Sequence, residues 1–182
     1  MKLLIAVIAA ALALAAPAAA SNVRNEKMPK PDSHRIAPPK SLGGIQIGDD
    51  LEDANEAWGG KGLCDTKVLP DSCFWGDFYD SRDGRAEIEA PGGVVDWVSI
   101  SWNGCCGGKD KPDVRQGVAN FRTKQGIHLG TKLEKVGKVY PDAEPIEHGV
   151  GGRIQAYVIE DDASGIIFGG GKYVNYINLF GN

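Results

Sequence analysis

The sequence predicts an α+β fold made of two tandem repeats, each a short helical segment followed by an antiparallel β-meander. The first observation is a repeated phrase, because GIQIGDDLEDANEAW at residues 44–58 returns as GIHLGTKLEKVGKVY at residues 126–140. Five of the fifteen aligned positions are identical, and four more exchange similar apolar residues. The second observation is that GGVVDWVSISW at residues 92–102 resembles GGKYVNYINLF at residues 170–180. Together the two matches indicate that one structural unit is built twice.

Residues 1–20 have the layout of a secretory signal peptide. Lys2 provides the positive start, an apolar run follows, and three alanines at residues 18–20 form a small-residue end. We therefore expect cleavage before Ser21 and a protein that is periplasmic or secreted. Nothing after Ser21 contains the run of about 20 apolar residues that a membrane-spanning helix needs, so no integral membrane segment is expected.

The rest of the chain divides into an arm and one domain. Residues 21–40 are polar, contain four prolines and show no apolar period, which predicts a flexible arm. Residues 41–182 are enough for a single domain with its own core. Its two repeats are expected at about residues 41–104 and 122–182, joined by a polar stretch.

The charge balance excludes one class of partner. The chain has 20 Lys and Arg against 24 Asp and Glu, a formal net charge of −4. Nucleic acids and anionic membranes attract proteins of the opposite sign, so neither is expected as a partner.

Each repeat opens with a short extended segment and a helix. A glycine breaks the extended segment, and a capping box is predicted to start each helix, Asp49-x-x-Glu52 in the first copy and Thr131-x-x-Glu134 in the second. An apolar stripe follows at helical spacing in both copies: Leu51, Ala54 and Trp58, then Leu133, Val136 and Tyr140. Gly59-Gly60 is expected to end the first helix, and Pro141 the second.

The strands of each meander follow its helix. Besides the two runs after the paired glycines, we expect strands around residues 73–79, 85–90, 153–160 and 165–168. Turns are predicted between them at SRDG, residues 81–84, and at EDDASG, residues 160–165.

The phrase Gly-Ile-x-Ile/Leu-Gly-x-x-Leu-Glu-x-Ala/Val, followed by a meander, resembles the repeat of β-lactamase-inhibitor-protein-like proteins. That group includes secreted tandem-repeat inhibitors and the small lipoprotein of the outer-membrane β-barrel assembly machinery. The resemblance covers nearly all of residues 41–182 and implies the fold, together with binding through an open sheet face. The lipid-anchoring cysteine of the assembly lipoprotein is missing, and no inhibitory residue of the inhibitors matches a position in this chain.

One face of the predicted sheet suits protein recognition. Since strands show alternate residues to opposite sides, Trp97 and Ser99 share a face, as do Tyr176 and Asn178 in the second copy. Large aromatic groups among small polar groups are typical of a recognition surface. The alternative is that Trp97 and Tyr176 pack the seam between the repeats. With no nucleic acid or membrane expected, the partner is predicted to be an unidentified envelope protein.

Four cysteines in an exported chain favour disulfides: Cys64, Cys73, Cys105 and Cys106. A bridge between Cys64 and Cys73 would leave the two vicinal cysteines to each other, at a Cα separation of about 3.8 Å that ordinary disulfide geometry does not permit. Cross-pairing of the vicinal cysteines with Cys64 and Cys73 would avoid that strain. The sequence leaves these pairings open and predicts at least one bridge that involves Cys64 and Cys73.

The motifs of the common enzyme classes do not occur in the sequence. It contains no nucleophile elbow, no His-Glu-x-x-His and no phosphate-binding loop, so no catalytic residue, cofactor or metal site is predicted. We expect a non-catalytic protein-binding module. The alternative is a thiol/disulfide-active envelope factor or enzyme that uses Cys105 and Cys106, because a strained vicinal bridge is easily reduced.

Overall fold

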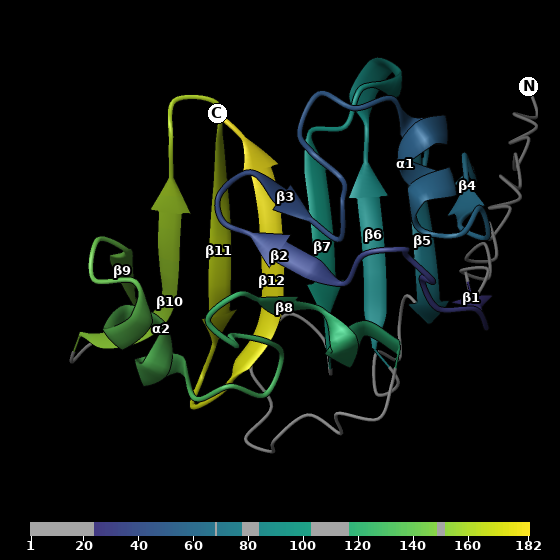
Figure 1. Ribbon diagram of the computed structural model, residues 1–182. Helices are drawn as coiled ribbons and strands as arrows, with labels where there is room; N and C mark the ends of the chain where they lie inside the picture. The colour runs from purple at the N-terminus through teal and green to yellow at the C-terminus, as the bar shows by residue number, and fades with distance from the viewer. Residues whose placement is uncertain (1–23, 68, 78–83, 103–116, 149–151) are drawn as a thin grey trace, which may run out of the picture.

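The computed structural model describes residues 24–67, 69–77, 84–102, 117–148 and 152–182 (Figure 1). Its helices are α1 (Leu51–Ala57), α2 (Leu133–Val139) and the 3-10 turns η2 (Pro91–Gly93) and η3 (Gly117–Asn120). Its strands are β1 (Arg24–Asn25), β2 (Arg35–Ala37), β3 (Ser41–Leu42), β4 (Leu63–Cys64), β5 (Ser72–Asp77), β6 (Arg85–Glu89), β7 (Trp97–Ser101), β8 (Arg122–Thr123), β9 (Glu144–His148), β10 (Arg153–Glu160), β11 (Ser164–Gly170) and β12 (Val174–Gly181). The predicted signal peptide at residues 1–20 lies outside the described residues, as do Cys105 and Cys106. Within the described part of the chain, no helix has the length and apolar character to cross a membrane.

A nine-stranded antiparallel sheet forms the body of the molecule. Its order is β1-β5-β6-β7-β12-β11-β10-β9, and β4 also pairs with β5 (Figure 1). Strands from the first part of the chain therefore occupy one half of the sheet, and strands from the last part occupy the other. The halves meet where β7 pairs with β12, with Ser99 opposite Asn178.

One face of this sheet is covered by α1, α2 and a small sheet of order β3-β2-β8 (Figure 1). Trp58 is fully buried at the end of α1 and makes edge-on contacts with Trp75 of β5 and with Phe121, at centroid distances of 5.3 and 5.5 Å. Its indole Nε1 donates a hydrogen bond to the Gly43 carbonyl at 3.3 Å. This one side chain thus joins the first helix, the large sheet and the segment leading into β8.

The start of α1 differs from the predicted capping box. Asp50, not Asp49, is the N-cap residue, and its Oδ1 accepts hydrogen bonds from the Glu52 and Asp53 amides at 2.8 and 3.4 Å. Asp49 instead accepts from the Gln46 amide at 2.8 Å and closes the turn before the helix. The prediction for α1 is wrong because a carboxylate one residue nearer to the helix reaches the orphan amides first.

The capping-box prediction is also wrong for α2. The N-cap residue is Lys132, whose side chain makes no capping hydrogen bond. Thr131 accepts from the His128 amide at 3.0 Å, so it closes the preceding turn in the same way as Asp49.

Each helical segment is tied by backbone hydrogen bonds to the chain at the start of a central strand, the first to Val95 just before β7 and the second to Val174 of β12. The backbone hydrogen bonds are Gly48 N–H to Val95 O and Val95 N–H to Asp49 O, then Gly130 N–H to Val174 O and Val174 N–H to Thr131 O, each 2.8 Å long. These contacts place each helix against the sheet face that carries the core.

The prediction of a flexible arm at residues 21–40 does not describe residues 24–40. β1 pairs with β5, and β2 pairs with both β3 and β8. Ile36 is only 1% exposed and belongs to the main core. Composition pointed to an arm because the segment is polar and rich in proline and contains a single isoleucine, and because two of the pairing partners, β5 and β8, lie far away in the sequence.

The predicted strands of the meanders are present: β10 has the predicted bounds, and the others begin or end within one or two residues of the prediction where the structure describes them. Strands expected at 73–79, 85–90, 153–160 and 165–168 correspond to β5, β6, β10 and β11. Strand β9 was not predicted, since its sequence EPIEH contains a proline and two glutamates. It forms because β10 offers it a free edge, a feature that no local sequence pattern reveals.

Candidate functional site

The candidate site is the face of the nine-stranded sheet opposite the helices, here called the outer face. Strand register places its central residues in three rows across β6, β7, β12 and β11: Glu89, Trp97, Phe180 and Gly165; Glu87, Ser99, Asn178 and Ile167; Arg85, Ser101, Tyr176 and Gly169. The alternate residues Val98, Ile100, Ile177 and Leu179 are fully buried on the core side. The four residues predicted for recognition therefore share one face, on neighbouring strands.

Trp97 and Phe180 form the aromatic end of this face. They are directly opposite each other on β7 and β12, their ring centroids are 6.3 Å apart, and both remain partly exposed. The Phe180 ring lies over Gly165 of the next strand so closely that a Cβ atom at that position would overlap it. Trp97 consequently contacts the seam between the two halves while keeping part of its surface accessible.

Tyr176 lies two rows away on the same face. Its ring covers Gly169 of β11, where an added Cβ atom would also overlap the aromatic ring. Tyr176 is partly exposed and faces Ser101 on β7. Both outer-face aromatic side chains of β12 therefore rest on glycines, which keeps the rings flat against the sheet.

The middle row between the aromatic residues is polar. Ser99 and Asn178 are opposite each other and partly exposed. The Asn178 Oδ1 atom is buried, yet among the described residues it has no hydrogen-bond partner. An unsatisfied buried acceptor costs roughly 1–3 kcal/mol.

Strand β6 adds charged residues to the face. Arg85 forms an ion pair with Glu87, which is only 7% exposed. Burial, followed by the neighbouring charge of Glu87, raises the pKa of Glu89, while Arg85 acts in the opposite direction. The carboxylates beside Trp97 make this part of the face acidic.

The sequence prediction omitted Phe180, Glu87 and Glu89 from the site. The signal for Phe180 was present, since it alternates with Asn178 and Tyr176 along one strand. The two glutamates required the register between β6 and β7, which the sequence alone does not specify.

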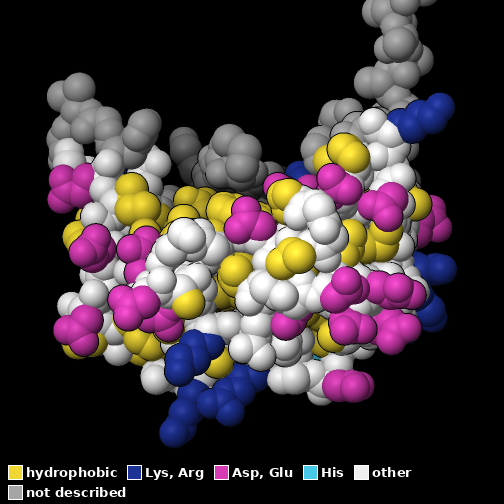
Figure 2. Space-filling model, turned by 90° about the horizontal axis from the view of Figure 1, so that it is seen from above, with side chains coloured by type: hydrophobic (Ala, Val, Ile, Leu, Met, Phe, Trp, Pro, Cys, Tyr) yellow, Lys and Arg dark blue, Asp and Glu magenta, His cyan; other side chains and the backbone are white. Residues whose placement is uncertain are grey.

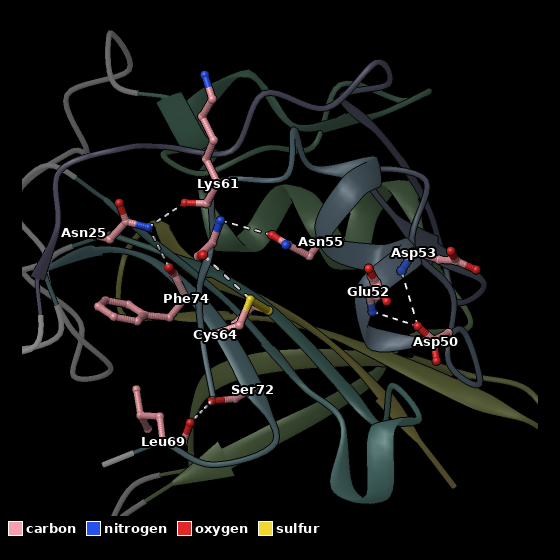
Figure 3. The surroundings of a disulfide bond; sticks show 12 residues. Asn25, Asp50, Glu52, Asp53, Asn55, Lys61, Cys64, Leu69, Ser72 and Phe74 are labelled. Atoms are coloured by element: carbon pink, nitrogen blue, oxygen red, sulfur yellow. Dashed lines mark hydrogen bonds between the residues drawn. A yellow bond between two sulfur atoms is a disulfide. The ribbon is translucent and has the colours of Figure 1, made fainter. Parts of the chain in front are cut away.

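Cys64 and Cys73 form a disulfide with an S–S distance of 1.92 Å. They are opposite each other on β4 and β5, so the bond fixes the short strand β4 to the sheet. Close by, the Asn25 side chain donates hydrogen bonds to the carbonyls of Lys61 and Phe74 at 2.8 and 3.0 Å (Figure 3). Of the pairings that the sequence left open, the structure contains the direct bridge.

No metal site is found in the part of the chain that the structure describes, because no three His, Cys, Asp or Glu residues are grouped to hold an ion. Comparison with known proteins finds no matching family model, no matching curated protein and no matching solved structure.

Proposed function

We propose that this protein is an exported, non-catalytic binding module of the bacterial envelope that recognises a partner protein through its outer face. Trp97 and Tyr176 are the aromatic anchors, and Ser99 and Asn178 supply polar contacts between them. The observation that carries the proposal is that these four residues lie, partly exposed, on the two central strands of the sheet, opposite the helices.

The chemistry of the face fits a protein partner. Aromatic side chains provide large contact area at low entropic cost and dominate the energetics of many interfaces. The rings are held by neighbouring strands, because Trp97 packs on Phe180 and Tyr176 rests on Gly169. A preorganised surface loses little conformational entropy on binding. Binding through a sheet face is also what the resemblance to β-lactamase-inhibitor-protein-like proteins implies.

The competing interpretation is that the aromatic residues only pack the sheet. Trp97 does contact Phe180 across the pairing of β7 and β12, so a packing role accounts for part of its surface. A packing role does not account for the Oδ1 atom of Asn178 in the adjacent row, which has no hydrogen-bond partner in the described part of the chain. Measurement of binding and stability in the same variants separates the two interpretations.

The test is capture of a partner from a bacterial envelope extract by immobilised wild-type protein and by Trp97→Ala and Tyr176→Ala. Each substitution is expected to keep the thermal unfolding transition and to weaken capture by at least about 2 kcal/mol, or about thirtyfold, if the residue is a hot spot. Val94→Ala is the matched control, because Val94 is 53% exposed and lies outside the outer face. If the two aromatic variants unfold, or bind as well as the control, the anchors are packing residues only.

The same experiment addresses the alternative of a thiol/disulfide-active factor. The bond between Cys64 and Cys73 leaves Cys105 and Cys106 as the remaining cysteines of the chain. The binding proposal expects Cys105→Ser to capture the partner normally. Loss of capture in this variant alone would favour the redox function over the outer face.

We also propose that the chain consists of two tandem repeats. In both halves an oxygen of residue 49 or 131 accepts from the amide three residues earlier, and the same two backbone bonds join the turn to the sheet. If the positions are equivalent, Asp49→Thr should retain stability to within about 0.5 kcal/mol, whereas Asp49→Ala should cost about 1 kcal/mol. Equal losses in urea unfolding for both variants would count against equivalence.

A further inference from the structure

A cavity of about 450 Å³ lies beside the start of α2, on the second half of the molecule. Three cationic side chains line it: Lys132 at the N-cap of α2, Arg153 at the start of β10 and Lys172 in the turn between β11 and β12. Apolar side chains of Leu133, Ile154 and Tyr157 line it as well. The volume falls in the range of about 300–1,000 Å³ that small-molecule sites occupy.

The scaffold under two of these cations is fixed by backbone pairing. The Leu133 amide donates a hydrogen bond to the Lys172 carbonyl at 3.1 Å, and Lys132 forms a β-bridge with Tyr173. The Lys172 ammonium lies 5.6 Å from the centre of the Tyr173 ring, within the range of a cation–π contact. Lys132 and Lys172 are therefore held near each other although 40 positions separate them in the sequence.

The local charge is positive in a chain whose net charge is negative. Glu134 is the acidic residue among those lining the cavity, and its carboxylate lies 4.0 Å from the Lys138 ammonium. The Glu147 carboxylate lies near Gly152 at the rim. A second hollow of about 380 Å³ shares Lys132 and Glu134 and adds Lys135 and Lys138. Figure 2, a view from above, shows one cluster of Lys and Arg side chains at its lower edge, while Asp and Glu side chains are spread over much of the visible surface.

We propose that this cavity binds a phosphate ester: a phosphate group held by Lys132, Arg153 and Lys172, with its organic part against Leu133, Ile154 and Tyr157. Three cationic residues from separate elements line one space, which matches a group with more than one negative charge and several acceptor oxygens. A single carboxylate would leave part of this donor set unused. The apolar side chains supply contacts that inorganic phosphate alone cannot use.

The test uses phenyl phosphate as the probe, with inorganic phosphate and phenol as partial probes. NMR titration of the intact protein should show phenyl phosphate binding tighter than either, with shifts in the methyl signals of Leu133 and Ile154. Arg153→Gln and Lys172→Gln should each weaken binding at least tenfold, since each removes a charge-assisted contact. Thermal unfolding checks that both variants are folded, and capture through the outer face should be unchanged in them.

Arg35→Gln and Lys124→Gln are matched controls, because both side chains are exposed cations outside the cavity. They should bind phenyl phosphate like the wild type. A second arm uses vesicles of phosphatidylglycerol beside vesicles of phosphatidylcholine. Binding to the former that requires Arg153 and Lys172 would identify a lipid headgroup as the phosphate source, while phenyl phosphate binding without vesicle binding would identify a soluble ester. Absence of binding in both arms, or equal weakening by the control substitutions, would overturn the proposal.

Discussion

Reduction of the bond between Cys64 and Cys73 is expected to destabilise the protein by a defined amount. The two residues are 9 positions apart. In the chain-entropy model, closing a loop of that size restricts the unfolded chain by about 2.6 kcal/mol at 25 °C. For a domain of this size, a loss of that magnitude lowers the melting temperature by roughly 5–10 °C.

The assay is urea unfolding of oxidised and reduced protein in a Cys105→Ser, Cys106→Ser background, so that only one bridge can respond. Reduction keeps both sulfur atoms in place, and Cys73 is fully buried, so a comparison by substitution would add a packing loss that reduction avoids. Hydrogen exchange should show faster opening of the Leu63 amide, because β4 has only two residues and depends on this link. Equal unfolding midpoints for the oxidised and reduced forms would refute the reasoning, as would a mass spectrum of the native protein in which Cys64 is joined to Cys105 or Cys106.

Three further substitutions test the packing and electrostatics. Trp58→Ala should cost about 3–5 kcal/mol in urea unfolding, since it removes a fully buried ring that contacts Trp75 and Phe121; a loss under 1 kcal/mol would contradict this packing. Glu89→Gln should stabilise the protein at pH 7 and lose that advantage near pH 4. The pKa of Glu89 is raised in the folded state, so the wild type has its full stability below the ordinary value of 4.5 and loses stability as the pH rises through the folded-state pKa, whereas glutamine stays neutral. A gain in stability that does not depend on pH would exclude that cause. Gly169→Ala should displace the Tyr176 ring, change the near-ultraviolet circular dichroism and lower the free energy of unfolding by about 1–3 kcal/mol. Gly171→Ala is the control and should have none of these effects, because no atom lies within 4 Å of a Cβ added there.

Alternation along strands was the part of the fold that the sequence predicted best. It placed Trp97 and Ser99 on one face and the buried Val98 and Ile100 on the other, because side-chain direction in a strand follows from local geometry. The recurrence of glycines and apolar positions likewise indicated both helices.

The features that the sequence did not predict depend on distant partners. The pairing of residues 35–37 with residues 122–123 joins segments more than 80 positions apart, and no local sequence pattern predicts it. The choice between Asp49 and Asp50 as cap rests on backbone geometry within a single turn. The sequence did not predict the basic cavity because net charge averages over the whole chain. Lys132 and Lys172 come close only in the fold, where Lys132 forms a β-bridge with Tyr173.

The two ends of the large sheet determine how another protein can approach it. Strand β9 closes one end with Pro145 and the exposed residues Glu144 and Glu147. At the other end, β5 is flanked by β1 and β4, each only two residues long. A proline removes a backbone donor, charges discourage pairing, and such short strands offer little ladder to extend. Both ends therefore discourage growth of the sheet by an added strand, and a partner of the kind proposed above would have to bind through side-chain contacts on the outer face.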